Sequence, residues 1–398
     1  MIQGTLEAQR NDIFSIFHDL FHQMMMPQPP VLHPSLDEKE IEKLKRLINA
    51  ADESNSGHQQ ASHKDHVLPS LKTVAVSDVT FSRDGSSRLG EGSFGKVYLG
   101  QLAGTSVAVK VLRGSTPQML KALKKEAMIM QLISNNPGIV SFYGVQIDEA
   151  PYFMVMEYCL LSLNDLLYPD ERNSAGVIKI PENLTSFTEQ TKTTLLYQVC
   201  CAMQYMHTLK IAHRDLKPAN VLISTGGHAK LSDFGLAQIK HIAFTSSTGG
   251  AAKGTAHYMA PELILSEDSP VYNESSDMYA FAVMMNETLD GRKPFDGLNM
   301  LPLQLMKRFM KDGDFRPDLF RKDEDFKRSG DGIVLALQKL IMKSWNSNPA
   351  ERYTFKDLTK KLKVYASYSS SSYSSFFPSS SLIIPPIPPF YKVIFLTY

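Results

Sequence analysis

Two hydrophobic periods divide residues 81–364 into a strand-rich part and a helix-rich part. Short apolar runs predict strands at 89–99, 106–112 and 152–158, the first two of them paired. Residues 117–133 have a helical period instead, with a proline in the first turn, where its missing N–H costs nothing. The pattern that follows is mostly helical. Strands followed by helices predict an α+β fold with a small β-rich N-terminal lobe and a larger helical C-terminal lobe.

The segments on either side differ in composition from this central part. A capping box at Ser35 and Glu38 opens a stretch whose apolar residues share one helical face. This amphipathic helix either lies loosely on the surface, docks on the neighbouring domain or binds a partner, and a polar linker follows it. The C-terminal segment is Ser/Tyr-rich and then Pro-rich, which predicts a disordered, low-complexity tail. The sequence thus predicts an N-terminal extension at 1–80, lobes at 81–158 and 159–364, and a tail at 365–398.

Charge and cysteine content narrow the classes of partner and compartment. The 42 Lys and Arg residues nearly cancel the 41 Asp and Glu residues, so charge gives no reason to expect nucleic acid or an anionic membrane as the main partner. The three cysteines, two of them adjacent, do not suggest a disulfide framework. They predict reduced thiols in the cytoplasm, with the nucleus as the alternative. The sequence contains neither a recognisable secretory signal nor an apolar run of transmembrane length.

A glycine-rich sequence lies between two strand-like runs. Gly90-Glu-Gly-Ser-Phe-Gly-Lys-Val97 has the spacing G-x-G-x-x-G-x-V, in which glycines let main-chain N–H groups approach phosphates. Alone this signal is weak, because glycine-rich hairpins and dinucleotide-binding turns look similar. Lys110 on the next strand is expected to point inward and to need an anion, and Glu126 in the following helix is the candidate carboxylate. Taken alone, Lys110 could be a surface lysine on an edge strand, and Glu126 could lie on a solvated helix face. The order and spacing of the glycine-rich loop, the lysine and the glutamate favour a phosphate site.

Two polar motifs follow in the second half of the central part. His213-Arg-Asp-Leu-Lys-Pro-Ala-Asn220 supplies an aspartate that can accept a hydroxyl proton and a lysine that can steady a transferring phosphoryl group. The amide of Asn220 offers a neutral oxygen to a metal. Asp233-Phe-Gly then adds a charged ligand of the kind that magnesium prefers. These motifs predict in-line phosphoryl transfer with Mg²⁺.

In this order the motifs resemble those of eukaryotic-type protein kinases, and the resemblance extends over about 81–364. It implies the two-lobed protein kinase fold, with ATP and Mg²⁺ as cofactors and proteins as substrates. It also implies that Asp215 is the catalytic base, that Lys217 steadies the phosphoryl group, and that Lys110 pairs with Glu126. The implied metal ligands are Asn220 and Asp233.

The same resemblance implies an ATP site between the lobes. Met156 would be the gatekeeper, and Glu157 and Cys159 would contact adenine through their main chains. The adenine ring would be sandwiched by Val97, Ala108 and Leu222. For those three, ordinary core packing is the competing interpretation. The implied ATP contacts are Gly90, Glu91, Gly92, Ser93, Phe94, Gly95, Val97, Ala108, Lys110, Met156, Glu157, Cys159 and Leu222.

Further resemblances concern the segments that support the site. Ala260-Pro-Glu262 resembles the end of an activation segment, and Glu262 is expected to pair with Arg352. Asp277 resembles the helix residue that braces the catalytic loop. Arg214 would be an unpaired cation until a phosphate on the activation segment, added by an upstream activating kinase, supplied its partner. The candidate sites for that phosphate are Thr245, Ser246, Ser247 and Thr248.

The residues around the catalytic motif also bear on specificity. Lys217-Pro-Ala219 resembles serine/threonine kinases, in which the residue matching Thr255 bridges Asp215 and Lys217. The surrounding 254–262 segment resembles the tyrosine-kinase-like branch. The implied function is transfer of the ATP γ-phosphate to Ser/Thr hydroxyls of proteins in intracellular signalling. A dual-specificity kinase and a pseudokinase scaffold are the alternatives, although a pseudokinase usually lacks the lysine or one of the aspartates.

Overall fold

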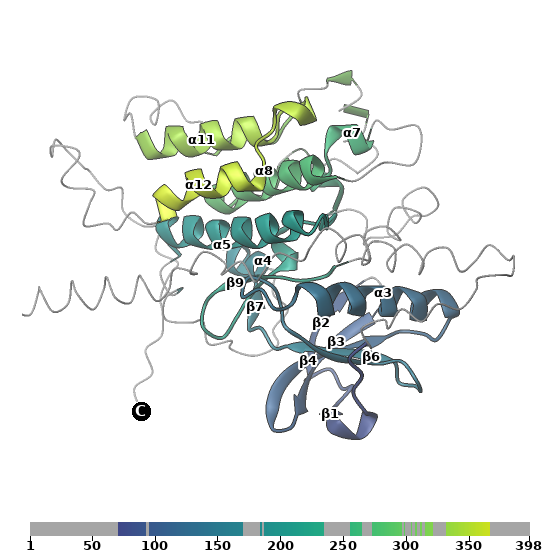
Figure 1. The fold of residues 1–398 in the computed structure, drawn as a ribbon. Coiled ribbons are helices and arrows are strands. Elements are labelled where there is room, and N and C mark those ends of the chain that lie inside the picture. Colours follow the sequence, from purple (N-terminus) through teal and green to yellow (C-terminus); the bar gives the residue numbers. More distant parts are fainter. Residues whose placement is uncertain are drawn as a thin grey trace, which may run out of the picture.

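A computed structural model describes residues 71–92, 95–169, 184, 187–234, 255–264, 273–296, 298, 304, 307–308, 311–312, 315–320 and 332–366. The described residues form a β-rich lobe and a helical lobe, which lie at opposite ends of the view in Figure 1. The predicted α+β, two-lobed architecture is therefore confirmed. The predicted N-terminal helix and the C-terminal tail lie outside the described residues, so the three-part division of the chain stays a prediction.

The β-rich lobe is built on a six-stranded sheet whose pairings along the main path are antiparallel. The prediction of one strand over 89–99 is wrong, because the chain reverses within the glycine-rich sequence, where Gly92 pairs with Gly95 across the hairpin. The strands predicted at 106–112 and 152–158 are confirmed to within a residue at each end. The sheet order is β1 (Val79–Phe81), β3 (Gly95–Leu102), β4 (Thr105–Leu112), β6 (Phe153–Glu157) and β5 (Phe142–Gln146), with β2 (Arg88–Gly92) paired to β3.

Helix α3 (Pro117–Ile133) has the bounds that the sequence predicts. The Thr116 hydroxyl caps it by accepting from the N–H of Met119 at 3.3 Å, and Pro117 fills the first turn. The apolar face of α3 packs against β5 and β6 and carries one carboxylate, Glu126, into the interior. The sequence of this helix thus fixes both its start and the position of Glu126.

Residues before β1 also pack on the sheet. The N–H of Val74 donates to the carbonyl of Val145 at 3.1 Å, and the N–H of Lys72 donates to the side chain of Gln131. A 3-10 turn, η1 (Val76–Asp78), leads from there into β1. The β-rich lobe therefore includes described residues that precede residue 81.

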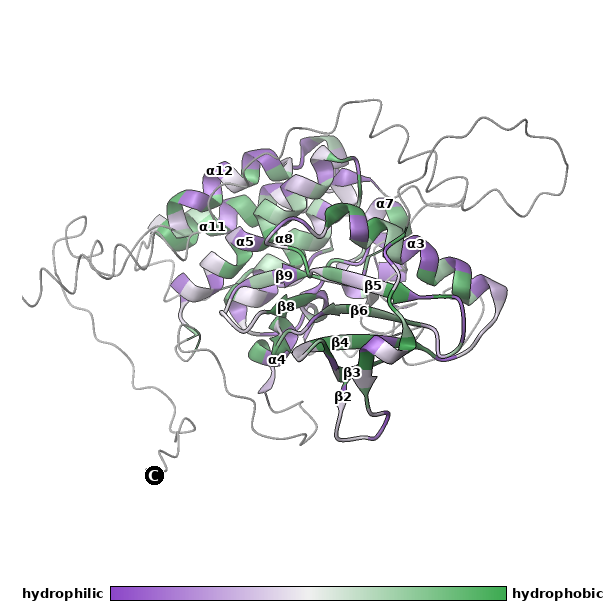
Figure 2. Cartoon of the chain, turned by 60° about the horizontal axis from the view of Figure 1, so that its bottom comes forward, coloured by the Kyte–Doolittle hydropathy of each residue, from purple (hydrophilic) through white to green (hydrophobic). Residues whose placement is uncertain are grey.

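The helical lobe is organised around α8 (Glu274–Asp290), most of whose residues are buried. Asn273 caps the start of α8, and Gly291 ends it at φ 78°, a left-handed conformation that favours glycine. Figure 2 shows apolar colouring on α8 and on strands β4 and β6, which contribute to the cores of the helical and the β-rich lobe. The remaining helices are α4 (Leu163–Leu167), α5 (Glu189–Thr208), α7 (Pro261–Ile264), α11 (Gly332–Ser344) and α12 (Phe355–Ala366).

A small three-stranded sheet carries the polar motifs of the second half. It consists of β7 (Leu161–Ser162), β8 (Val221–Ile223) and β9 (Ala229–Leu231), with the 3-10 turn η4 (Pro218–Asn220) directly before β8. Its strands connect to the β-rich lobe, since the N–H of Val140 donates to the carbonyl of Leu231 at 3.0 Å. None of the helices among the described residues has the length and apolarity that a membrane crossing requires.

Candidate active site

Lys110 joins three separate segments of the chain at one buried point. It is 4% exposed on β4, and its ammonium donates to Glu126 Oε1 on α3 and to Asp233 Oδ1, each at 2.7 Å. Burial by itself would lower the pKa of Lys110, but the charges of Asp233 and Glu126 outweigh it and raise that pKa. The predicted pairing of Lys110 with Glu126 is therefore confirmed, and Lys110 remains a cation.

The predicted catalytic aspartate lies in a compact cluster around η4. Lys217 Nζ lies 3.2 and 3.0 Å from the two carboxylate oxygens of Asp215. The side-chain amide of Asn220 donates to Asp215 Oδ2 at 2.9 Å and to the Asp215 carbonyl at 2.6 Å. The structure thus brings Asp215, Lys217 and Asn220 together as the sequence predicts, and it fixes the rotamer of the aspartate from two sides.

Hydrogen bonds through Ser232 connect this cluster to Asp233. The N–H and hydroxyl of Ser232 both donate to the Asn220 carbonyl, at 3.0 and 3.1 Å. The His213 ring donates from Nε2 to the Ser232 carbonyl at 3.1 Å, while Nδ1 accepts from the Asp215 N–H. Burial lowers the pKa of His213, which keeps this neutral tautomer in place. The cluster around Asp215 and the residues before Asp233 are therefore one hydrogen-bonded unit.

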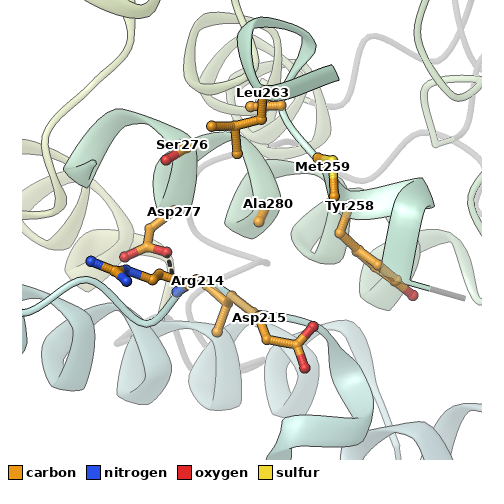
Figure 3. Close-up of a pocket in the computed structure, with 10 residues that line it drawn as sticks. Arg214, Asp215, Tyr258, Met259, Leu263, Ser276, Asp277 and Ala280 are labelled. Carbon is orange, nitrogen blue, oxygen red and sulfur yellow. Dashed lines mark hydrogen bonds between the residues drawn. The ribbon is translucent and has the colours of Figure 1, made fainter. Parts of the chain in front are cut away.

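Asp277 braces the catalytic segment from the first turn of α8, as the resemblance implies. Its carboxylate accepts from the N–H groups of His213 and Arg214, each at 2.8 Å, and contacts His207 Nε2 at 2.9 Å. Figure 3 shows Asp277 pointing from the helix toward the backbone of Arg214. Arg214 has φ 71°, a left-handed value that is unfavourable for a residue with a side chain. The buried carboxylate stabilises this backbone conformation.

A 3-10 turn, η6 (Thr255–Tyr258), packs against the same segment. Tyr258 and Met259 line a space of about 20 Å³ together with Arg214, Asp215 and residues of α8 (Figure 3). That volume holds about one water molecule. The turn before Ala260, the catalytic segment and α8 are therefore closely packed beside Asp215.

Glu287 is a site feature that the sequence analysis missed. It is 1% exposed on α8, and its carboxylate accepts from the hydroxyl of Tyr168 at 2.8 Å and of Tyr258 at 2.7 Å. Burial raises the pKa of Glu287 to about 7, although both tyrosines oppose this. The available signal was a carboxylate two residues after the apolar stretch 278–285, but nothing local indicates partners 119 and 29 residues away.

The predicted pair of Glu262 and Arg352 is confirmed. The guanidinium donates to both carboxylate oxygens, at 2.7 and 2.8 Å, and also to the carbonyls of Asn346 and Ser275. The Arg352 side chain is 0% exposed. This bidentate pair fixes α7 against the segment that follows η7 (Pro349–Glu351).

The residues predicted to contact a nucleotide are placed around Lys110. Val97 is the cross-strand partner of Lys110, and Ala108 lies two residues before it, so all three share one face of the sheet. Ala108 pairs with Met156 on β6, and Leu222 lies on β8 beside η4. The interpretation of a sandwich around adenine stays a prediction, because these positions fit core packing as well.

Gly95 and Gly90 of the glycine-rich hairpin differ in the space around them. A Cβ on Gly95 would lie 2.2 Å from the Val111 carbonyl oxygen, so the close approach of β3 and β4 requires glycine. A Cβ on Gly90 would meet nothing within 4 Å, which leaves open space above the hairpin. The Glu91 carboxylate contacts Arg88 and Arg113. Ser93 and Phe94, which follow Gly92 in the chain, lie outside the described residues.

Glu157, the last residue of β6, has its side chain fixed by hydrogen bonds. The Glu157 side chain accepts from the N–H and hydroxyl of Ser141, at 3.1 and 3.0 Å, and from Lys230 at 2.8 Å. Burial raises the pKa of the Cys159 thiol to about 12, so this cysteine is an unreactive thiol. The contacts of their main chains to adenine stay a prediction.

Asn220 and Asp233 together fit a magnesium ion. The Asn220 amide nitrogen is committed to Asp215, which leaves its oxygen as the group that can face a metal. The Asp233 side chain is 38% exposed, and its backbone has φ 61°. An amide oxygen and a carboxylate are the hard donors that Mg²⁺ takes from protein when phosphate and water supply the rest.

The predicted phosphorylation sites and the predicted bridge by Thr255 stay predictions. Thr245, Ser246, Ser247 and Thr248 lie outside the described residues. So does the side chain of Thr255. The Arg214 guanidinium has no carboxylate within ion-pair distance in the part of the chain that the structure describes.

Comparison with protein families gives one match that covers most of the chain. Residues 84–362 match the model of a family described as protein tyrosine and serine/threonine kinase. This range contains every residue of the site described above.

Individual relatives are similar at modest identity. The chain is 32% identical over 247 residues to the serine/threonine-protein kinase pakH of Dictyostelium discoideum, a match that covers 61% of the chain and 44% of that protein. It is 28% identical to the dual specificity protein kinase shkD of the same organism, covering 70% of the chain and 34% of that protein. It is 29% identical to fibroblast growth factor receptor 1 of Pleurodeles waltl, covering 74% and 36%. The matched part thus spans less than half the length of each of these relatives.

Proposed function

The chain belongs to the protein tyrosine and serine/threonine kinase family, and from this premise we propose that it transfers the γ-phosphate of ATP to Ser/Thr hydroxyls of protein substrates. One observation carries the proposal: the ammonium of Lys110 bonds Glu126 and Asp233 at the same time, at 2.7 Å each. That contact unites the sheet, helix α3 and the metal-binding segment. A scaffold protein without activity would not need this arrangement, in which three segments meet at one buried cation.

Asp215 is the proposed catalytic base. The substrate hydroxyl oxygen attacks the γ-phosphorus, the bond to the bridging oxygen of ADP breaks, and the hydroxyl proton passes to Asp215. Asn220 and Lys217 orient the carboxylate that receives this proton. Lys217 would balance the charge of the transferring phosphoryl group.

The nucleotide and its metal would lie between Lys110 and this cluster, which shares the proposed metal ligand Asn220. Lys110 would bind the α- and β-phosphates, and Asn220 and Asp233 would hold Mg²⁺. When bound, magnesium neutralises the charge that develops on the phosphate oxygens. The open space above Gly90 fits a ligand that approaches the hairpin backbone closely.

Specificity for Ser/Thr is the finer part of the proposal. Lys217-Pro-Ala219 supports it, as does the relative named a serine/threonine-protein kinase. A dual-specificity kinase is the second candidate, because another relative carries that name and the family includes tyrosine kinases. A role in cytoplasmic signalling, with an upstream kinase that phosphorylates one of the candidate sites between Thr245 and Thr248, completes the proposal.

The test is phosphate transfer from labelled ATP onto a library of Ser, Thr and Tyr peptides. We expect Ser/Thr peptides to be labelled and Asp215→Asn to reduce turnover by about a hundredfold or more, while ATP binding measured by calorimetry is retained. Transfer to tyrosine as well would establish dual specificity. If neither protein transfers phosphate after treatment with an activating kinase, the chain is a scaffold and the proposal is wrong.

A further inference from the structure

A second hollow lies on the helical lobe, far from the residues that the proposed reaction uses. It has a volume of about 510 Å³ and lies where the end of α11, the segment after η7 and the first turns of α12 meet. In Figure 1 these two helices lie at the end of the molecule farthest from the large sheet. The size is in the range of pockets that bind small ligands or single side chains with their neighbours. The lining residues are Lys343, Ala350, Glu351, Arg352, Tyr353, Asp357, Lys360 and Lys361.

Two lysines of this hollow share one aromatic ring. The ammonium of Lys343 lies 4.9 Å from the centroid of the Tyr353 ring, and that of Lys361 lies 5.4 Å from it. The face of an aromatic ring attracts cations, which offsets part of the repulsion between the two ammonium groups. Tyr353 thus contacts one cation from each of the two helices.

The three lysines of the hollow outnumber the two carboxylates that line it. Among the described residues, no carboxylate lies within ion-pair distance of Lys343, Lys360 or Lys361. The remaining cation, Arg352, is fully used by Glu262 and by two carbonyls. A ligand with several anionic oxygens would therefore gain three charge-assisted contacts that no internal group provides.

The shape and the acidic residues favour a phosphorylated peptide over a membrane. Glu351 and Asp357 also line the hollow, and the Asp357 carboxylate accepts from the Thr354 hydroxyl at 2.6 Å. A dense anionic lipid surface would bring charge against both carboxylates. A single phosphate on an otherwise uncharged peptide brings less negative charge near these carboxylates than a lipid surface does, and the hollow is concave where a bilayer surface is flat.

The chain itself contains a segment with this chemistry next to the hollow. Residues 367–381 follow α12 directly, are rich in serine and have no charged side chain. Lys361 lies less than two helical turns before the end of α12 at Ala366. About ten extended residues span roughly 33 Å, so a serine in this segment can return to the hollow. Covalent connection also gives the segment a high effective concentration there.

We propose that the hollow around Tyr353 is a docking site for phosphoserine, and that its occupant is the serine-rich segment 367–381 after phosphorylation. In the modification, a kinase transfers the γ-phosphoryl group of ATP to a serine Oγ, and ADP and the hydroxyl proton are released. The phosphate then accepts from Lys343, Lys360 and Lys361. Docking is independent of the catalytic activity proposed above, because any kinase can supply the phosphoryl group.

Binding to the full-length, phosphatase-treated chain tests the site. The probe is a fluorescent peptide of residues 367–381 with phosphoserine at 370 and 372, compared with its unphosphorylated form. We expect only the phosphorylated probe to bind, and we expect a variant with Lys343→Gln, Lys360→Gln and Lys361→Gln to bind it at least about tenfold more weakly. The matched control is a variant with Lys339→Gln, Lys356→Gln and Lys363→Gln. These lysines lie on the same two helices but outside the hollow, so the control loses the same charge. The control should weaken binding by less than about threefold.

A second measurement tests the occupant. A full-length chain with phosphoserine incorporated at 370 and 372 should bind the probe more weakly than the unphosphorylated chain, because its own tail fills the site. Equal probe binding by these two chains would overturn the assignment of the tail. Equal loss in the lysine variant and in its control would overturn the site. Binding of phosphatidylserine-containing vesicles that depends on the three lysines, without peptide binding, would show that the site takes a membrane and that the proposal is wrong.

Discussion

The buried carboxylate of Glu287 makes the stability of this protein depend on pH in a direction that can be calculated. Its ordinary pKa is 4.5, and burial raises it to about 7 in the folded protein. The folded chain therefore keeps a proton over a pH range in which the unfolded chain has lost it. The protonated form of Glu287 therefore stabilises the folded chain. This contribution to the free energy of unfolding is fully present below pH 4.5 and is lost as the pH rises through about 7.

The size of the effect follows from the same two values. Each pKa unit corresponds to about 1.4 kcal/mol, so ionising Glu287 in the folded protein costs about 3 kcal/mol. Most of this cost should develop between about pH 5 and pH 8. Glu287→Gln cannot ionise, and its amide can still accept a hydrogen bond from Tyr168 or Tyr258. The unmodified chain should therefore lose about 2 to 3 kcal/mol relative to this variant over that range.

Urea unfolding followed by tryptophan fluorescence measures the difference. The chain has one tryptophan, Trp345, and it is buried in the helical lobe. The control is Glu274→Gln, which removes an exposed carboxylate from the same helix. If the difference between the unmodified chain and Glu287→Gln is the same at about pH 5 and pH 8, Glu287 is ionised throughout and burial does not dominate its environment.

Three further predictions concern other contacts of the site. Glu262→Gln leaves the fully buried guanidinium of Arg352 without its counter-charge, and we expect the free energy of unfolding to fall by about 3 to 5 kcal/mol in urea titrations; a change near zero would mean that the carbonyl partners suffice. Gly95→Ala forces β3 and β4 apart at the Val111 carbonyl and should lower the melting temperature, whereas Gly90→Ala enters open space and should leave it unchanged; equal effects would contradict the steric argument. Lys110→Met removes the cation that Glu126 and Asp233 share, so calorimetry should show at least a tenfold loss of ATP affinity. Retained affinity would remove Lys110 from the nucleotide site.

Local features of the sequence were enough to locate the elements with strong local signals. Helix α3 has its predicted bounds because Thr116 and Pro117 determine its start independently of the rest of the chain. The spacing of Asp215, Lys217 and Asn220 also predicts a cluster, since five residues of tight turn cannot place these side chains far apart. The hairpin at 90–97 was placed less well, because the glycines that mark a turn also interrupt the apolar alternation that marks the strands on either side.

Contacts between distant segments needed either the family resemblance or the tertiary structure. Glu262 and Arg352 are 90 residues apart, and only the resemblance paired them. The link from Tyr168 through Glu287 to Tyr258 was not predicted at all. The sequence by itself therefore determined helix α3, strands β4 and β6 and the local motifs, whose interactions act over a few residues. Only the tertiary structure decided which buried charges meet, because burial and distance depend on how the elements pack and not on where they lie along the chain.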